Sequence, residues 1–392
     1  MATVKKVIVV AKVIGYGNSM KQKIISFFIP DLNGAGAEMV AVNLANEMAR
    51  QGYYVHMTLM RKQGDYLSYL HSNITVFDLQ IPINQNSRYK FKYVVWPLTN
   101  YLREQKPDVM IVYSWPLTFH AVLTKKIARS CTKIIASEHI CWSAYLKPKS
   151  FCRRLKIRLG MALAYRLNDV VLNVSLDASR DLERFAFLPR NFVDTIYNPY
   201  RPQINEREKN VLSSWDGRYK ILSVGRLSNQ KNYPLLLEAL ALVRKKLDAS
   251  LVILGRGEHE AILKEQAKNL GISKYVSLAG FVEQPLAYYQ QADLYVMSSD
   301  YEGLPNVLLE ALSQGLPIVS TNCPTGPREI LDNGKFGLLS PVGDAENLAE
   351  NIVQSLTKKH DKEKLIERSQ MFNIEKITKQ YLSLIEKQVV AK

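Results

Sequence analysis

The chain repeats one pattern from residue 23 onward: a short apolar run rich in β-branched or aromatic residues, a loop, and an amphipathic helical segment. The first such parts read IISFFIP, NGAGAEMVAVNLANEMARQG and YYVHMTLM, and later runs include DVMIVYS, KIIASEH and DVVLNVS. Strand-like runs that alternate with helices predict parallel strands joined by helical crossovers. We therefore expect an α/β protein with doubly wound sheets.

The pattern lapses once, where NPYRPQINEREKNVLSSWDGRY is polar and contains prolines, as linkers do. A second series begins at YKILSVGRL and continues through ASLVILGRG, YVSLAGF, ADLYVMSS, PIVSTN and FGLLSP. With 392 residues, the chain is too long for one core. We expect a loose extension over 1–19, a first domain over 20–199, a linker over 200–219, a second domain over 220–370, and a helix over 371–392 that packs back on the first domain. Ligands of such sheets bind beyond the carboxyl ends of the strands, so the site should lie between the domains.

Charge and cysteine content narrow the class of protein. Lys and Arg number 52 against 36 Asp and Glu, and the net charge of +16 favours phosphates, nucleic acid or an anionic membrane as partners. The four cysteines form no C-x-x-C pair, which indicates reduced thiols in a cytoplasmic protein. Lys12 interrupts the N-terminal apolar run and no small-residue cleavage site follows, so we expect no signal peptide, and Met20 is an alternative start. No apolar stretch reaches the ~18 residues that span a bilayer.

One segment, SSDYEGLPNVLLEA over residues 298–311, leads from the run ADLYVMSS into an apolar helix. Pro305 suits a first helical turn, and the amides at a helix start carry a partial positive charge that favours a phosphate. These would be the amides of Asn306, Val307 and Leu308. Glu310, one turn later, could bind a ribose diol, while Glu302 could meet hydroxyls beyond the second phosphate. The alternative is an ordinary helix start with acidic residues.

The loop VGRLSNQKNYPLLLEAL offers cations for the same ligand. Arg226 follows Gly225 just after a strand-like run, and Lys231 lies at the mouth of the next helix. Two cations there could neutralise a diphosphate leaving group, and such charge stabilisation is often the largest catalytic effect. A solvated basic loop is the alternative.

An ordered series of motifs runs along most of the chain: NGAGAE, ASEH, IYNP, SVGRLSNQKN, LVILGRGE, SLAGF, ADLYVMSSDYEGLPNVLLEAL, GLPIVST and GPREIL. This series resembles the retaining nucleotide-sugar glycosyltransferases of family 4. The resemblance implies the glycosyltransferase-B architecture, with a Rossmann-like acceptor domain facing a Rossmann-like nucleotide-sugar-binding domain across a cleft. It also implies roles for four side chains: Arg226 and Lys231 contact the donor diphosphate, Glu302 the transferred sugar, and Glu310 the ribose.

The same resemblance implies two sites in the first domain. LNGAGAEMV would close over the diphosphate, with Gly34 and Gly36 allowing close backbone approach, although Ala35 departs from the usual Gly-Gly-Ala-Glu. His139, in ASEHICW, matches a family histidine near the reacting sugar. The alternatives are a common strand-to-helix glycine turn and a structural histidine.

The sequence lacks the motifs typical of dinucleotide, metal-diphosphate and P-loop nucleotide sites. GRGEHE lacks the third glycine of a dinucleotide fingerprint, and no D-x-D or G-x-x-x-x-G-K-[ST] occurs. We expect no cofactor and no metal, only a nucleotide sugar as co-substrate. In this family the departing phosphate oxygen is thought to take the acceptor proton, and Glu302 would then stabilise the developing oxocarbenium charge.

The stretch KPKSFCRRLKIRLGMALAYRLND, residues 147–169, interleaves cations with apolar side chains. Such a helix suits an anionic leaflet, and a solvated helix face is the alternative. TNCPTGPREIL and IYNPY are most similar to bacterial enzymes of surface polysaccharide and lipid-linked oligosaccharide synthesis. We therefore expect a peripheral enzyme on the inner face of the cytoplasmic membrane, bound through 147–166. It would move a hexose or N-acetylhexosamine from a UDP sugar to a lipid-linked glycan or a lipopolysaccharide core.

Two other functions stay open. A nucleotide-sugar epimerase of the same fold would need no acceptor. A nucleic-acid-binding protein would carry aromatic residues among its cations, whereas the basic stretch here carries mostly aliphatic ones, so we expect no nucleic-acid partner.

Overall fold

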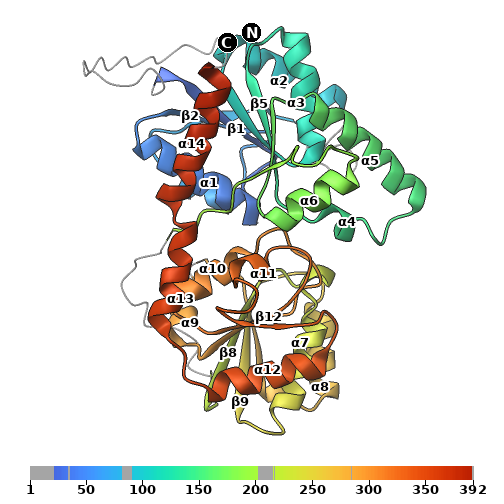
Figure 1. The fold of residues 1–392 in the computed structure, drawn as a ribbon, viewed down its shortest axis with the longest axis vertical. Helices are drawn as coiled ribbons and strands as arrows, with labels where there is room; N and C mark the ends of the chain where they lie inside the picture. Colours follow the sequence, from blue (N-terminus) through green and yellow to red (C-terminus); the bar gives the residue numbers. More distant parts are fainter. Residues whose placement is uncertain are drawn as a thin grey trace.

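A computed structural model describes residues 22–33, 36–81, 91–201, 215, 217–283 and 285–390, without the side chains of 91, 92 and 390. The expected extension over 1–19, Gly34 in the glycine loop and most of the expected linker lie outside these residues. The described chain forms two parallel α/β sheets, one above the other in Figure 1, with helices on both faces of each. This confirms the predicted fold class.

The first sheet has seven strands in the order β3-β2-β1-β4-β5-β6-β7. The strands are β1 (Ile24–Ile29), β2 (Tyr54–Leu59), β3 (Thr75–Asp78), β4 (Val109–Tyr113), β5 (Lys133–Glu138), β6 (Val170–Asn173) and β7 (Asp194–Thr195). The helices are α1 (Gly36–Arg50), η2 (Asp65–Tyr69), α2 (Phe91–Gln105), α3 (Trp115–Ala128), α4 (Trp142–Tyr145), α5 (Phe151–Arg166) and α6 (Leu176–Phe185). The two edge strands, β3 and β7, are short and were not predicted.

The second sheet has six strands in the order β10-β9-β8-β11-β12-β13. The strands are β8 (Tyr219–Val224), β9 (Ala249–Leu254), β10 (Val276–Gly280), β11 (Leu294–Met297), β12 (Ile318–Thr321) and β13 (Leu338–Ser340). The helices are η3 (Asn229–Lys231), α7 (Tyr233–Val243), α8 (Glu260–Asn269), η4 (Ser273–Tyr275), α9 (Leu286–Gln291), α10 (Asn306–Ser313), α11 (Pro327–Ile330), α12 (Ala345–Thr357), α13 (Lys362–Ser369), η5 (Gln370–Phe372) and α14 (Ile374–Val390). Each of the six strands falls within one of the predicted apolar runs.

Strand β1 shows why the runs are apolar throughout. Ile25, Phe27 and Ile29 belong to a buried cluster with residues of α1 and α14, while Phe28 belongs to another cluster with residues of α2 and α3. Successive side chains of a strand point to opposite faces, and a parallel sheet is covered on both. A continuous apolar run is therefore what a central strand of this sheet requires.

The chain passes between the two domains twice, and the two connecting segments are in contact. The amide of Tyr200, at the end of the first sheet's chain segment, donates to the carbonyl oxygen of Phe372 at 2.6 Å. Helix α14 then returns along α1, where Ile377, Tyr381 and Ile385 are buried in the core of the first sheet (Figure 1). Among the described helices, none is long and apolar enough to cross a bilayer.

Candidate active site

The strand order of the second sheet reverses between β8 and β11. From β8 the chain continues to β9 on one side, and from β11 it continues to β12 on the other side. In open α/β sheets, the crevice beyond such a point is where ligands bind. The loops that follow these two strands carry Arg226, Lys231 and Glu302. The sheet order thus places the predicted side chains at one end of the sheet.

Lys231, in the loop after β8, forms an ion pair with Glu302, in the loop after β11. Lys231 Nζ lies 2.7 Å from Oε1 of Glu302, whose side chain is buried with 8% of its surface exposed. The same oxygen accepts a hydrogen bond from Ser299 Oγ at 2.6 Å, and Oε2 accepts one from Gln230 Nε2 at 3.3 Å. Both oxygens of the carboxylate are therefore fixed. Sequence reasoning missed Ser299 and Gln230, although both lie within three residues of a predicted site residue.

The loop after β8 leaves little space around Lys231. A Cβ atom on Gly225 would lie 3.0 Å from Lys231 Cε and 3.1 Å from the hydroxyl of Tyr233. Glycine at this position allows the lysine to lie along the backbone toward Glu302. Arg226, the next residue, is exposed, and no ion pair involving it is found among the described residues.

Helix α10 begins at Asn306, directly after Pro305. The amide of Leu308 already donates to the carbonyl oxygen of Pro305 at 3.1 Å, so the prediction that it is available to a phosphate is wrong. The tight first turn of the helix satisfies this donor internally. Asn306 and Val307 remain as the candidate phosphate-binding amides.

Glu310 lies one turn further along α10 and is half-buried. Its Oε2 accepts a hydrogen bond from the hydroxyl of Tyr289 at 2.7 Å. Burial raises the pKa of Glu310 above its usual value, while the Tyr289 hydroxyl and the charge of Lys231 act in the opposite direction. Burial also holds the pKa of Tyr289 well above its usual range, so Tyr289 stays a donor to this carboxylate.

The first domain meets the start of α10. Asn306 Nδ2 lies 3.4 Å from the carbonyl oxygen of Gly36, and Asn306 Oδ1 accepts from Asn198 Nδ2 at 2.8 Å. Gly36 is therefore brought to the predicted phosphate site. Gly34, the other glycine of this loop, lies outside the described residues.

His139 follows β5, and its side chain packs within the first domain. Its ring stacks on Tyr113 with centroids 4.8 Å apart, and its Nε2 lies 3.0 Å from Ser137 Oγ. Burial lowers the pKa of His139 to about 3, so the imidazole is neutral near pH 7. A Cβ atom on Gly303 would lie 2.1 Å from the carbonyl oxygen of His139, so the loop that carries Glu302 presses directly on the His139 backbone.

A further set of contacts joins the two domains, and sequence reasoning assigned it no role. The carboxylate of Glu329 accepts hydrogen bonds from the amides of Leu176 and Asp177, each at 2.8 Å, at the start of α6. Arg328 pairs with the Asp177 carboxylate at 2.9 Å. An acidic side chain at a helix start is favoured by the helix dipole. The motif GPREIL thus holds α11 of the second domain against α6 of the first.

Two family models match the chain in succession. The family described as Glycosyltransferase Family 4 matches residues 34–203, and the family described as Glycosyl transferases group 1 matches residues 204–372. An uncharacterized glycosyltransferase of Haemophilus influenzae is 28% identical over 93% of this chain and 100% of its own length. The N-acetylgalactosamine-N,N'-diacetylbacillosaminyl-diphospho-undecaprenol 4-alpha-N-acetylgalactosaminyltransferase of Campylobacter jejuni is 27% identical over 92% of this chain and 99% of its own length. The solved structure of Anabaena HepE in complex with UDP superposes with a TM-score of 0.73 at 20% identity and covers 93% of this chain and all of that one, which shows a shared fold.

Proposed function

Because the chain belongs to the family 4 glycosyltransferases, we propose that it moves a hexose or N-acetylhexosamine from a UDP sugar to a lipid-linked or lipopolysaccharide-core sugar. The observation that carries the proposal is the buried Lys231–Glu302 pair at the switch point of the second sheet, next to the start of α10. The arrangement brings a cation, a carboxylate and a helix start to the same end of the second sheet. These are the groups that a sugar diphosphate needs.

The diphosphate would lie between the start of α10 and the loop after β8. The amides of Asn306 and Val307 would donate to one phosphate, with Arg226 and Lys231 providing positive charge. Gly36 would approach from the first domain, because its carbonyl oxygen already lies beside Asn306. These cations and amides would balance the diphosphate charge, so we propose transfer without a metal ion.

Glu310 and Glu302 would bind opposite ends of the nucleotide-sugar donor. Glu310 would accept hydrogen bonds from the ribose hydroxyls, in an orientation held by Tyr289. Glu302 would face the transferred sugar, and its charge would stabilise the positive charge that develops at the anomeric carbon. His139, as a neutral imidazole, would hydrogen-bond a sugar hydroxyl rather than act as an acid near pH 7.

The transfer would retain the anomeric configuration. The bond from the anomeric carbon to the diphosphate oxygen breaks, and the acceptor oxygen bonds to the same carbon from the same face. The acceptor proton passes to the departing phosphate oxygen, so no side chain has to act as base. Lys231 would stabilise the negative charge that develops on that leaving group.

Two of the relatives support the choice of substrates. The Campylobacter jejuni enzyme is named for a diphospho-undecaprenol acceptor, and the Anabaena structure holds UDP. Surface-glycan synthesis on a lipid carrier is therefore the function that we propose. A cytoplasmic protein bound to the inner face of the membrane would meet both substrates.

The nucleotide assignment is tested by calorimetric titration with UDP and with GDP. Glu310→Ala should weaken UDP binding by about 10- to 150-fold, which corresponds to the ~1.5 to 3 kcal/mol of a charge-assisted hydrogen bond. Glu265→Ala, on the exposed side of α8, is the matched control and should bind as the wild type does. Unchanged UDP affinity in Glu310→Ala would remove the ribose role, and preference for GDP would remove UDP.

The reaction itself is tested with UDP-hexoses and UDP-N-acetylhexosamines in the presence of a bacterial lipid extract. We expect glycosylated lipid only when both substrates are present, with the donor's anomeric configuration in the product by NMR. Full conversion of the donor in the absence of lipid would show an epimerase instead.

A further inference from the structure

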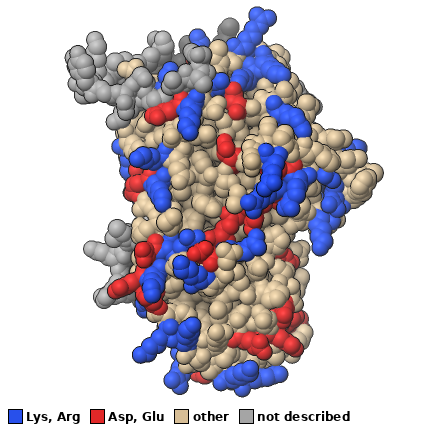
Figure 2. Space-filling model, viewed as in Figure 1, with Lys and Arg blue, Asp and Glu red and all other residues tan. Residues whose placement is uncertain are grey.

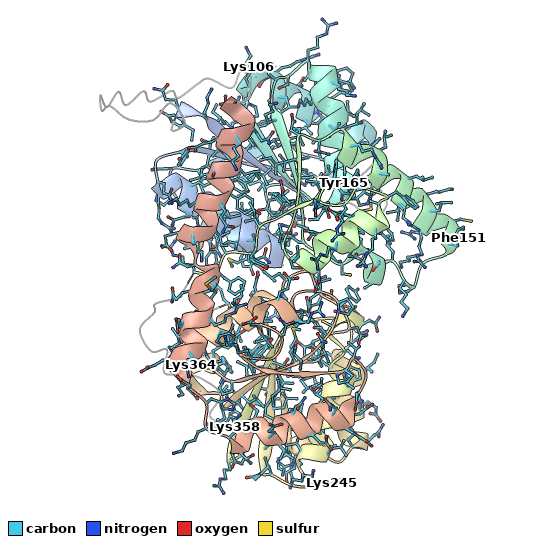
Figure 3. The ribbon with its side chains drawn as sticks, viewed as in Figure 1. Lys106, Phe151, Tyr165, Lys245, Lys358 and Lys364 are labelled. Carbon is cyan, nitrogen blue, oxygen red and sulfur yellow. The ribbon has the colours of Figure 1, made fainter. Side chains whose placement is uncertain are left out.

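Two motifs of the sequence have no role in the proposed function: IYNP over residues 196–199 and GPREIL over residues 326–331. Both lie where the domains meet. In Figure 1, α6 of the first domain lies above α11 of the second, and in Figure 3 side chains from both domains occupy the space between these helices. Figure 2 shows acidic and basic side chains beside one another at the same level. The segment between β11 and α10, residues 298–305, carries Glu302 and is called the Glu302 loop below.

The carbonyl oxygen of Gly303, in this loop, accepts hydrogen bonds from both domains. Ser175 Oγ of the first domain and Thr325 Oγ1 of the second each lie 3.0 Å from it. Thr325 Oγ1 lies equally close, at 3.0 Å, to the carbonyl oxygen of Glu302. A hydroxyl has one proton, so Thr325 divides its donation between two oxygens, whereas Ser175 directs its proton to Gly303. Because Ser175 is fully buried, water does not take its place.

Asn198, in the motif IYNP, holds the residues that follow. Its Nδ2 donates to the carbonyl oxygen of Leu304 at 3.2 Å and to Asn306 Oδ1 at 2.8 Å, and Asn198 is buried. The second domain fixes the carboxylate of Glu302, through Lys231 among others. The backbone between Glu302 and α10 depends in addition on donors from the first domain.

The start of α6 fixes the Ser175 hydroxyl. Ser175 is the N-cap residue of this helix, and its Oγ accepts from the amide of Ala178 at 3.2 Å. The two preceding amides, of Leu176 and Asp177, are ones that a helix leaves without an internal partner. They donate to the carboxylate of Glu329 in the second domain, each at 2.8 Å. The first turn of α6 is thus capped by its own serine and by an acid from the other domain.

Glu329 is itself fixed by neighbours on two sides. Its Oε2 also accepts from the hydroxyl of Tyr197 at 3.0 Å. Burial and the charge of Glu329 raise the pKa of Tyr197 to about 12, so Tyr197 stays a donor near pH 7. Arg368 of α13 donates to the carbonyl oxygen of Glu329 at 2.6 Å and to that of Ile330 at 2.8 Å. Both the backbone and the side chain of Glu329 are therefore held in place.

We propose that Ser175 and Glu329 are positioning residues for the transfer reaction. Glu329 caps α6 from the second domain, the capped helix orients the Ser175 hydroxyl, and this hydroxyl fixes the backbone directly after Glu302. The Glu302 loop then keeps its geometry only while α6 and α11 are in contact. The proposal rests on the role proposed for Glu302 at the transferred sugar, and it adds one residue from each domain that acts without touching the substrate.

Amide hydrogen exchange of the full chain, followed by mass spectrometry, tests the loop without any substrate. The amide of Glu302 donates to the carbonyl oxygen of Pro324 at 2.7 Å. In Ser175→Ala, the peptide that contains this amide should exchange about fivefold faster, because the loop loses a buried hydrogen bond. Ser175→Thr keeps the hydroxyl and should exchange as the wild type does.

Two variants are matched controls. Asp344→Ala removes the N-cap of α12, whose side chain accepts from the amide of Asn347 at 2.9 Å within the second domain. Arg328→Gln removes the ion pair to Asp177 between the same two helices, α11 and α6, in which the arginine side chain is 52% exposed. Both should leave exchange of the Glu302 loop unchanged, because neither removes a donor to it.

Glu329→Gln tests the same contact from the second domain and changes no residue of α6. The side-chain amide keeps one acceptor oxygen, so one of the two α6 amides loses its partner. Exchange should be several-fold faster both at the start of α6 and in the Glu302 loop. Ser175→Ala/Glu329→Gln should speed exchange of the loop no more than Ser175→Ala alone does, because both substitutions act through the same hydroxyl.

Turnover of UDP-hexoses and UDP-N-acetylhexosamines with a bacterial lipid extract tests the consequence for the reaction. Ser175→Ala should lower kcat by at least about tenfold while its UDP affinity stays within about twofold of the wild type, and Ser175→Thr should restore kcat. Loop exchange or kcat equal to the wild type in Ser175→Ala would overturn the positioning role. Faster loop exchange in this variant, together with a wild type that transfers no sugar, would instead contradict the proposed function and leave the contact between Ser175 and the loop established.

Discussion

Glu138, at the end of β5 and directly before His139, gives the sharpest quantitative prediction. Its side chain is 1% exposed, Oε1 accepts from the hydroxyl of Tyr165 at 2.8 Å, and Oε2 accepts from Trp142 Nε1 at 2.9 Å. Burial raises the pKa of Glu138 from 4.5 to about 7, although both hydrogen bonds lower it. The carboxyl is therefore half-protonated near neutral pH.

The sign of the effect on stability follows from the order of proton release. Below about pH 4.5 the carboxyl holds its proton in both the folded and the unfolded chain, and the stabilising contribution is complete. As the pH rises, the unfolded chain releases the proton first, and the folded chain does so only near pH 7. The free energy of unfolding should fall by about 1.4 kcal/mol per pH unit in this window, or about 3 kcal/mol in all.

Glu138→Gln removes this titration without removing the hydrogen bonds. The amide oxygen can accept from Trp142, and the amide nitrogen can donate to the Tyr165 oxygen after its hydroxyl rotates. The variant should match the wild type within about 1 kcal/mol at pH 5 and exceed it by up to about 3 kcal/mol at pH 8.5. The prediction concerns the difference in free energy of unfolding between the variant and the wild type, not either value alone.

The measurement is urea unfolding from pH 5 to pH 8.5, followed by tryptophan fluorescence and circular dichroism so that the two domains can be separated. Glu104→Gln, at an exposed position on α2, is the control and should show no such pH-dependent gain. A difference between Glu138→Gln and the wild type that stays constant across this pH range would refute the reasoning.

The remaining predictions concern the candidate active site. Lys231→Ala should lower kcat by at least about a hundredfold, because the leaving-group charge loses its cation, and a variant with unchanged kcat and altered KM would contradict that role. Gly303→Ala should lower kcat by at least about tenfold, because the added Cβ must push the loop that carries Glu302 away from the His139 backbone, 2.1 Å from its carbonyl oxygen. Wild-type turnover in Gly303→Ala would show that this contact does not position the loop.

The local sequence was sufficient for the elements that depend on near neighbours along the chain. Each apolar run became a strand because a parallel sheet buries both faces, and Pro305 was followed by a helix because it needs no amide donor there. The same locality explains the error at Leu308, since only the actual turn geometry shows that its amide is satisfied by Pro305. The short edge strands were missed because two to four residues carry too little pattern.

The composition of α5 predicted a basic amphipathic helix, but the sequence could not say which side would face water. Both sides carry large apolar residues, and only packing of Met161 and Tyr165 into the first domain left Phe151, Leu159 and Leu163 exposed. Helical periodicity identifies apolar faces, but it does not show which of two such faces is buried.

By itself the sequence determined the two series of strands and helices, the helix start at Asn306, and which side chains follow the strands at the candidate site. Tertiary structure alone decided the distances between them. Lys231 meets Glu302 across 71 residues, and Glu329 meets Asp177 across 152, because strand order and domain packing bring these loops together. Contacts of that separation depend on the whole chain's burial of apolar surface, which no short stretch of sequence encodes.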